Sequence, residues 1–309
     1  MATKNTFFLH PEHFGEMEYR LYKKTVKLEV LKDIINGRKY VDYRVSRTDV
    51  LHMQEGNNKL GHILCFNFAV AQTCNHSCEC CKGYDAETTT KKGKKKVKHI
   101  LPCYALNGSF LMISNQRLYS ENLAFYRENG IDTTVNAIAE IIRRYPDCDK
   151  VRFFSCGDFP DAGFVEVVHK LALMFPNVSF YAYTKKYALV NTYVRRVGIE
   201  SIPENMVVIF SHWRNNDGTY FPMVNPFDFP TSEFVPHGME YILEKLNPGD
   251  HICPCSDETK LEHCDNCSTP CYKMKRGQKM YLLEHSTMFT KARDMAVKLA
   301  HAALAAAMK

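Results

Sequence analysis

Apolar residues in the middle of the chain alternate between short runs typical of buried strands and longer runs at helical spacing. Strand-like runs begin at Val151, Val178 and Met206, and the segments 164–175 and 187–198 between them have the pattern of amphipathic helices. Strands and helices that alternate in this way form parallel βαβ units. The pattern predicts an α/β fold, either a partial (βα) barrel or an open parallel sheet, whose ligands gather at the carboxyl ends of the strands.

Segments outside this core also carry periodic patterns. Upstream, the run HILCFNFAVA from His62 predicts a strand, and helical spacing covers about 16–36, 114–129 and 132–145. Asp132 and Thr133 are candidate caps of the last of these helices. At the other end, the alanine-rich segment from about Thr287 to Met308 predicts a packed C-terminal helix.

These patterns divide the chain into three regions. Residues 1–60 are predicted to form an N-terminal helical extension, 61–250 the α/β core, and 251–309 a cysteine-rich segment with the C-terminal helix. The chain contains 309 residues of which 45% are hydrophobic, so it can bury a sizeable core. No stretch approaches the roughly 18 apolar residues of a membrane helix, and no secretory signal is recognisable. We therefore expect a cytoplasmic protein with no membrane contact.

The chain has 13 cysteines, and in a reducing compartment clustered thiols indicate metal binding or catalysis rather than disulfides. Directly after the strand that begins at His62, TCNHSCECC contains Cys74, Cys78 and Cys81 at the spacing C-x3-C-x2-C. Three thiolates on one tight loop can hold three corners of a cubane iron–sulfur cluster. Cys103, in PCYA, is a candidate fourth ligand. If Cys103 does not bind, one iron stays open to a substrate.

A second cysteine set lies in HICPCSDETKLEHCDNCSTPCY. Cys264 and Cys267 form C-x2-C, Cys271 follows at x3, and Cys253 is a candidate fourth ligand. Four thiols so close together in a cytosolic chain are a strong signal of metal binding. Zinc and iron both accept four thiolates, so the spacing leaves the metal of the second set open.

Polar residues at the predicted carboxyl ends of the strands are candidates for a ligand site. In SCGDF, Gly157 allows close approach of the backbone and Asp158 could hold an amine or a hydroxyl, while Cys156 is interpreted as strand packing. Lys185 and His212 end the next two strands. Together these residues suit an anionic or zwitterionic small molecule at the barrel rim, and the alternative is that they are solvated loop residues.

The net charge of +6 is modest, but six lysines gather between Lys91 and Lys98 in KKGKKKVK. A block of this kind predicts a solvated, flexible loop that could contact the phosphates of a nucleic acid.

Several motifs, in the same order, resemble those of the phage protein family called gene product 88-like. They are TCNHSC, PCYA, VRFFSCGDF, VSFYAYTKK, HICP and CDNCSTPC, which span residues 65–275. The strand followed by TCNHSCECC is also similar to the cluster loop of radical S-adenosylmethionine enzymes, although Cys80 stands where those enzymes usually have an aromatic residue. SCGDF is similar in placement to the motif that holds the amino group of S-adenosylmethionine in those enzymes.

The family resemblance implies an iron–sulfur protein of viral origin, acting in the host cytoplasm, with a core similar to a partial radical-enzyme barrel. It implies that Cys74, Cys103 and one or two of Cys78 and Cys81 surround the first cluster. The second cluster would be held by Cys253, Cys264, Cys267 and Cys271. The lysine-rich insertion between Cys81 and Cys103 leaves the choice among Cys78, Cys80 and Cys81 open.

Three functions follow from these patterns. The first is an iron–sulfur protein with one or two 4Fe-4S clusters for electron transfer, structural or redox roles. The second is a radical enzyme that binds S-adenosylmethionine at an open iron, and the third is a zinc-bearing nucleic-acid-binding module. The supply of thiols, sufficient for two fully ligated clusters, favours the first. The sequence indicates neither a substrate nor an oligomeric state.

Overall fold

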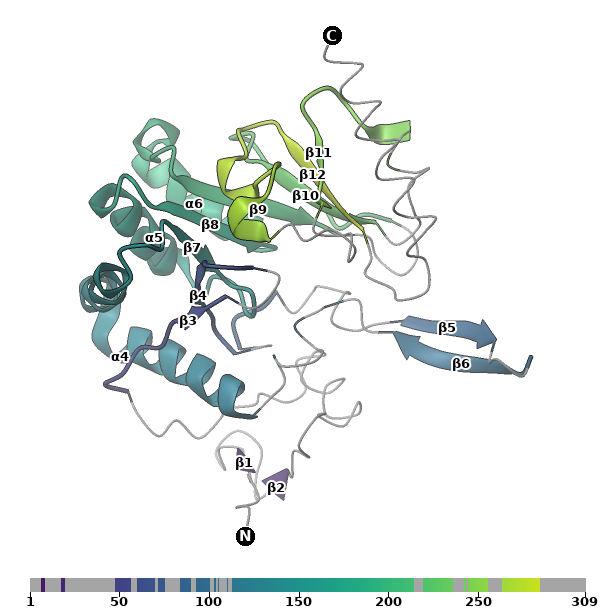
Figure 1. Ribbon diagram of the computed structural model, residues 1–309, viewed down its shortest axis with the longest axis horizontal. Helices are drawn as coiled ribbons and strands as arrows, with labels where there is room; N and C mark the ends of the chain where they lie inside the picture. The colour runs from purple at the N-terminus through teal and green to yellow at the C-terminus, as the bar shows by residue number, and fades with distance from the viewer. Residues whose placement is uncertain are drawn as a thin grey trace.

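The computed structural model describes residues 7–8, 18–19, 48–56, 60–69, 72–75, 84–89, 93–100, 103, 105, 110, 113–213, 219–235, 242, 244–254 and 263–283. Its centre is an eight-stranded sheet with helices packed against one face (Figure 1). Within the described ranges, no helix combines the length and the apolar character that crossing a bilayer requires.

The sheet is open and almost entirely parallel, with the strand order β11-β12-β10-β9-β8-β7-β4-β3. Every pair of neighbours is parallel except β3 and β4, which are antiparallel. The strands are β3 (Gln54–Glu55), β4 (Leu64–Phe66), β7 (Lys150–Phe153), β8 (Ser179–Thr184), β9 (Met206–His212), β10 (Thr231–Val235), β11 (His251–Ile252) and β12 (Lys279–Leu283). The predicted α/β class is confirmed, and of its two alternatives the structure has the open sheet.

Three helices cover one face of this sheet: α4 (Ile113–Arg144), α5 (Ala162–Met174) and α6 (Tyr187–Val197). The two helices predicted over 114–129 and 132–145 form the single run α4, with a break in helical geometry at Gly130, whose φ is 74°. Helix α5 begins at the cap Asp161, whose carboxylate accepts a hydrogen bond from the Phe164 amide at 3.1 Å. Helices α5 and α6 join β7 to β8 and β8 to β9, as the βαβ pattern predicted.

Smaller elements complete the described fold. Three short 3₁₀ turns are η3 (Ile199–Ser201), η5 (Cys264–Asn266) and η6 (Cys271–Lys273). Strands β1 (Phe7–Phe8) and β2 (Glu18–Tyr19) form a separate antiparallel pair. The helix predicted over 16–36 is therefore wrong at Glu18–Tyr19, where a local apolar pattern is overridden by strand pairing. The rest of that segment and the predicted helix from Thr287 to Met308 lie outside the described residues.

The lysine-rich segment belongs to a β-hairpin that projects from the body of the molecule (Figure 1). Strand β5 (Tyr84–Thr89) pairs with β6 (Lys95–Ile100), with Thr89 opposite Lys95 and Glu87 opposite Val97. The prediction of a flexible loop over Lys91–Lys98 is thus corrected for the part in β6. Its physical reason is that β-branched threonines and Val97 favour extended backbone, and the opposing strand satisfies the backbone hydrogen bonds.

Neighbouring residues of a strand point to opposite faces of a sheet, and here the two faces differ in chemistry. The helix face carries a core of buried aromatic side chains, among them Phe66 and Phe153 from the strands and Phe164 from α5. The rings of Phe66 and Phe164 stack with centroids 5.3 Å apart. On the opposite face, which we call the cysteine face, the same strands contribute Cys65, Tyr181 and Tyr183 to a second cluster.

Candidate metal centres

The second cysteine set gathers on the cysteine face of the sheet. Cys253 follows β11 and is 9% exposed, while Cys264, Cys267 and Cys271 belong to or border the turns η5 and η6. All four pack into one cluster with Tyr181, Val207, Ile209, Tyr272 and Met280. The structure thus brings together the four residues that were predicted to act as the second ligand set.

Hydrogen bonds hold the segment that carries Cys264 and Cys267 against the sheet. The backbone amide of His62 donates to Asp265 Oδ2 at 2.8 Å, and the hydroxyl of Tyr272 donates to the carbonyl oxygen of Asp265 at 3.2 Å. Gly61 has a φ of +69°, and a Cβ at this position would lie 2.2 Å from the Asp265 carboxylate. Glycine is therefore needed where the chain before β4 meets the cysteine segment.

The thiol of Cys271 lies in surroundings that disfavour a free thiolate. Burial raises the pKa of Cys271 to about 12, and charge on Cys253 and Cys264 acts in the same direction. The hydrogen bond from Tyr183 and the charge of Arg152 oppose the increase. Several thiols that penalise one another's ionisation are stabilised as thiolates when a metal binds them.

Two side chains of the sheet polarise this sulfur. The hydroxyl of Tyr183 donates a hydrogen bond to Cys271 Sγ, with a distance of 2.8 Å between the two atoms. The guanidinium carbon of Arg152 lies 5.5 Å from the ring centroid of Tyr183 and 6.0 Å from that of Tyr181. A hydrogen-bond donor and a cation thus lie beside the cysteine set, on the same face of the sheet.

The first cysteine set is described only in part. Cys74, beyond the carboxyl end of β4, and Cys103 are half-buried, whereas Cys78, Cys80 and Cys81 lie outside the described residues. Cys156 is 1% exposed and follows β7, the neighbour of β4. Burial raises the pKa of its thiol, and charge on Cys74 and Cys103 raises it further.

Cys156 is the residue of this region that the sequence interpretation assigned to packing alone. Its amide donates to Asn67 Oδ1 at 3.0 Å, and Gln116 Nε2 lies 3.8 Å from its sulfur. The preceding Phe154 has a φ of 61°, an uncommon conformation for a residue with a side chain. A signal for its placement was present, because Cys156 and Cys74 follow strands whose carboxyl ends meet at one edge of a parallel sheet.

Gly157 and Asp158 join the loop after β7 to the loops after β4 and β8. A Cβ on Gly157, whose φ is +83°, would lie 2.9 Å from both the Phe68 carbonyl oxygen and Thr73 Oγ1. The buried Asp158 carboxylate accepts hydrogen bonds from three groups: Thr184 Oγ1 at 2.6 Å, the Phe159 amide at 2.8 Å and the Lys185 amide at 2.9 Å. Burial raises the pKa of this carboxyl, and the three hydrogen bonds oppose the increase. The Asp158 amide also donates to Thr73 Oγ1 at 2.9 Å, so Asp158 ties three loops together. Its role toward a ligand stays a prediction.

The other two predicted rim residues make different contacts. Lys185 Nζ lies 5.8 Å from the centroid of a Trp213 ring, and the Lys185 carbonyl oxygen accepts from Asn75 Nδ2 at 3.0 Å. The His212 ring stacks on Tyr220 with centroids 4.4 Å apart, and burial lowers the pKa of His212. The structure brings Lys185 to Asp158 but pairs His212 with Tyr220.

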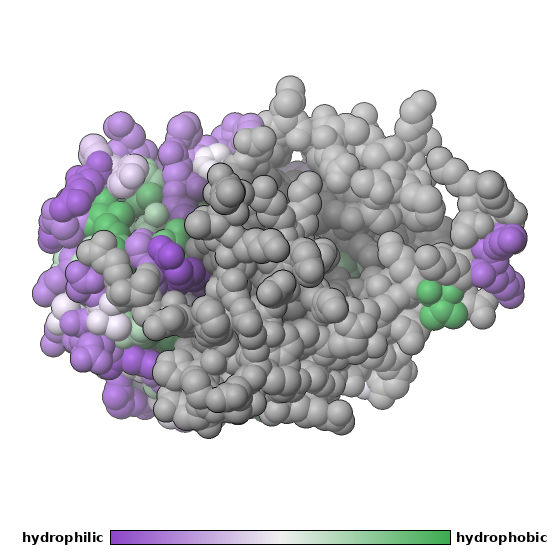
Figure 2. Space-filling model, turned by 90° about the horizontal axis from the view of Figure 1, so that it is seen from below, coloured by the Kyte–Doolittle hydropathy of each residue, from purple (hydrophilic) through white to green (hydrophobic). Residues whose placement is uncertain are grey.

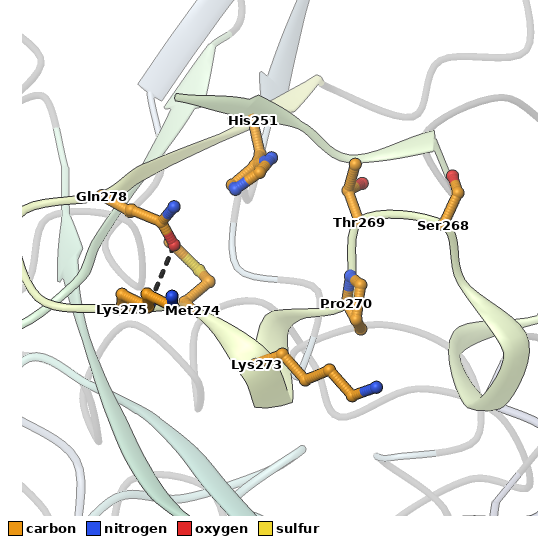
Figure 3. A pocket seen from close by; sticks show the side chains of 8 residues that line it. All are labelled: His251, Ser268, Thr269, Pro270, Lys273, Met274, Lys275 and Gln278. Carbon is orange, nitrogen blue, oxygen red and sulfur yellow. Dashed lines mark hydrogen bonds between the residues drawn. The ribbon is translucent and has the colours of Figure 1, made fainter. Parts of the chain in front are cut away.

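A pocket of about 220 Å³ lies beside the second cysteine set (Figure 3). It is lined by residues of the segment 268–278 together with His251, and Gln278 accepts a hydrogen bond from the Lys275 amide at 2.7 Å. The predicted rim residues do not line this pocket.

Across the described part of the chain, no three His, Cys, Asp or Glu side chains are arranged to hold a single metal ion. A zinc ion draws its sulfurs to about 2.3 Å from the metal, whereas a cubane binds one thiolate at each iron and takes thiolates that stand further apart. The donor set predicted for the second site, four cysteines, is of the kind that holds a 4Fe-4S cluster. The residues present therefore fit such a cluster in number and in chemistry.

A family model described as gene product 88 matches residues 45–242, which is more than half of the chain. The matched segment contains the cysteines of the first set and ends before Cys253, so the second set lies outside it. No curated protein and no solved structure matches the chain.

Proposed function

The chain belongs to the gene product 88 family, and we propose that it is an iron–sulfur protein that holds one or two 4Fe-4S clusters for electron transfer, structural or redox roles. The observation that supports this most directly is the gathering of the four second-set cysteines in one packed cluster. Soft thiolate ligands select iron–sulfur clusters and zinc over harder metal ions.

In this proposal, Cys253, Cys264, Cys267 and Cys271 hold one cluster. Cys74 and Cys103, with one or two of Cys78 and Cys81, hold the other. A bound cluster would supply one-electron redox chemistry, with a potential that depends on burial, charge and hydrogen bonds to sulfur. The chain contributes an apolar sheet face that excludes water, and Arg152 and Tyr183 offset the negative charge of the sulfurs.

Iron and acid-labile sulfide, measured in full-length protein purified without oxygen, test this proposal. We expect about four irons and four sulfides for each occupied cysteine set, and a paramagnetic signal after reduction. Cys264→Ala should remove the content of the second set and Cys74→Ala that of the first.

The matched control is Cys148→Ala. The Cys148 thiol donates to the carbonyl oxygens of His62 and Lys150 at 3.3 Å and belongs to neither set, so this variant should keep all its iron. Protein that contains neither iron nor sulfide, or that keeps both in full after Cys74→Ala and Cys264→Ala, contradicts the proposal.

A radical S-adenosylmethionine enzyme is the second candidate. It is favoured by the loop that follows β4 and carries Cys74, because Thr73 Oγ1 in this loop would lie 2.9 Å from a Cβ on Gly157, just after the neighbouring strand β7. Isothermal titration of anaerobically reconstituted protein with S-adenosylmethionine tests it, since an open iron should bind this molecule. Loss of the first cluster in both Cys81→Ala and Cys103→Ala would instead support ligation by cysteine at every iron.

Nucleic-acid binding by a zinc-bearing protein is the third candidate, and the projecting hairpin favours it. Lys94, Lys95 and Val97 are exposed there. Figure 2 shows a hydrophilic surface at the end of the molecule. Colourless protein that carries zinc after anaerobic purification, and a DNA affinity that falls steeply with added salt, are its expected results.

A further inference from the structure

One hydrogen bond links the sheet directly to a predicted cluster ligand. Tyr183 is on strand β8, and its hydroxyl lies 2.8 Å from Cys271 Sγ. An unperturbed tyrosine ionises near pH 10, so at neutral pH its O–H is a donor and the sulfur accepts. The contact joins residues 88 positions apart in the chain, so it depends on the fold and not on the local geometry of the cysteine turns.

The surroundings of Tyr183 hold this donor in place. Residue 183 pairs with Ile209 of β9, so the neighbouring strand fixes its backbone. The Arg152 guanidinium carbon lies 5.5 Å from its ring centroid, on the same face of the sheet. A side chain fixed in this way loses little entropy when it makes its hydrogen bond, and it keeps the direction of the O–H constant.

Tyr181 provides a natural comparison on the same strand and the same face. Its ring also lies near Arg152, at 6.0 Å, and packs against Tyr272 with centroids 5.9 Å apart. Within the described part of the chain, Tyr181 makes no hydrogen bond to a cysteine sulfur. The two tyrosines thus lie on the same strand and the same face, and both lie near Arg152. They differ because Tyr183 donates a hydrogen bond to a cysteine sulfur.

We propose that Tyr183 is a positioning residue that raises the reduction potential of the cluster held by Cys253, Cys264, Cys267 and Cys271, by donating its hydrogen bond to Cys271 Sγ. The inference rests on the function proposed above. Reduction adds one electron from an external low-potential donor and breaks no bond. The reduced cluster carries more negative charge on its sulfurs, so a donor aimed at one sulfur stabilises the reduced form more than the oxidised form.

Tyr183→Phe and Tyr181→Phe, in full-length protein purified without oxygen, test this role. Both variants keep the ring and its packing, so both should retain the wild-type content of iron and sulfide. In the Cys74→Ala background, which leaves iron on the second set, potentiometric titration followed by paramagnetic resonance reports this cluster alone. Tyr183→Phe should shift the midpoint potential of this cluster to a more negative value. We expect a change on the order of tenfold in the ratio of oxidised to reduced cluster at a given potential, which corresponds to about 59 mV for one electron. Tyr181→Phe should leave the midpoint at the wild-type value.

A second readout is the exchangeable proton beside the reduced cluster. Electron–nuclear double resonance in H₂O and D₂O should detect this proton in wild-type protein and in Tyr181→Phe, and lose it in Tyr183→Phe. An unchanged midpoint in Tyr183→Phe with full iron content overturns the inference and leaves the proposed function intact. Loss of iron in Tyr183→Phe assigns the residue to cluster retention and also overturns it. Wild-type protein without iron overturns both.

Discussion

The two faces of the central sheet are built from neighbouring residues of the same strands, yet they have opposite chemistry. On the helix face, Phe153 and Phe180 pack in a buried aromatic core whose described residues include Cys148 but none of the predicted ligands. On the cysteine face, their neighbours Arg152 and Tyr181 lie beside the second cysteine set. Alternation along a strand thus separates the packing that stabilises the fold from the groups that act on sulfur. It follows that one face can be altered with limited effect on the other.

The largest expected effect is on the helix face. Phe164 is fully buried and its ring contacts those of Phe66, Phe68 and Tyr126. Phe164→Ala should lower the free energy of unfolding by about 3–5 kcal/mol, because it removes these contacts and leaves a cavity. Urea denaturation measures the loss. Leu173→Ala, on the same helix but 60% exposed, should change the value by no more than about 0.5 kcal/mol. A loss below about 1 kcal/mol for Phe164→Ala would show that this face is not the main source of stability.

A smaller effect is expected at the edge where the strand ends meet. Asp158→Ala leaves Thr184 Oγ1 and the amides of Phe159 and Lys185 without their acceptor. We expect a loss of about 2–3 kcal/mol, since buried donors without a partner are costly. The exposed Glu204→Ala is the control, with a change within about 0.5 kcal/mol. Equal stability of the two variants would argue that Asp158 does not hold the loops together.

Removal of the proposed cluster should change the stability effect of a substitution on the cysteine face and leave that of a substitution on the helix face unchanged. In metal-free protein, Cys267→Ser should change the free energy of unfolding by less than about 1 kcal/mol, because this side chain is half-buried. In metal-loaded protein the same substitution should cost more, since the metal stabilises only the folded chain. Phe164→Ala should cost the same in both states. Denaturation with and without metal measures this, and an equal cost of Cys267→Ser in both states contradicts it.

The smallest effect concerns His212, which continues the row of Val208 and Phe210 on β9. Burial lowers its pKa, while Glu233 raises it and Lys279 lowers it. The His212 ring therefore takes up a proton more readily in the unfolded chain than in the folded chain. The stability that the neutral ring contributes is lost as pH falls below about 6.5. The free energy of unfolding should fall when the pH is lowered from about 7 to about 5. In His212→Gln this fall should be smaller than in the wild type, by less than about 1 kcal/mol. Denaturation at both pH values measures the difference, and an identical loss in the variant excludes His212 as its source.

The sequence predicted the centre of the fold better than its borders. Strands β7, β8 and β9 and the helices between them have strong local periodicity, so the pattern alone indicated them. Strands β10, β11 and β12 are two to five residues long and are held by parallel pairing with distant segments. Pairing of this kind has no local signature, so the sequence left open whether the sheet closes into a barrel.

The same distinction applies to the metal centres. The gathering of the second set involves three cysteines at close spacing within one segment, together with Cys253, which lies 11 residues before Cys264. The approach of Cys156 to Cys74 depends on the pairing of β4 with β7, and the Tyr183 contact depends on how η6 packs under β8. Spacing therefore predicted that the four thiols of the second set lie in one cluster. The side chains that affect the pKa of Cys271, namely Tyr183 and Arg152, became visible only in three dimensions.

The lengths of the two edge strands of the sheet affect whether strands of other chains can pair with it. An unpaired strand at the side of a sheet is a template on which a foreign strand can add, and long, flat ones promote aggregation. Here the sheet ends in β3 on one side and β11 on the other, and each has only two residues. So short a template offers few free amides and carbonyls, and among the described residues each of the six longer strands has a partner strand on both sides. The sheet thus limits its own growth, and β-sheet extension from one copy to the next is disfavoured at both sides.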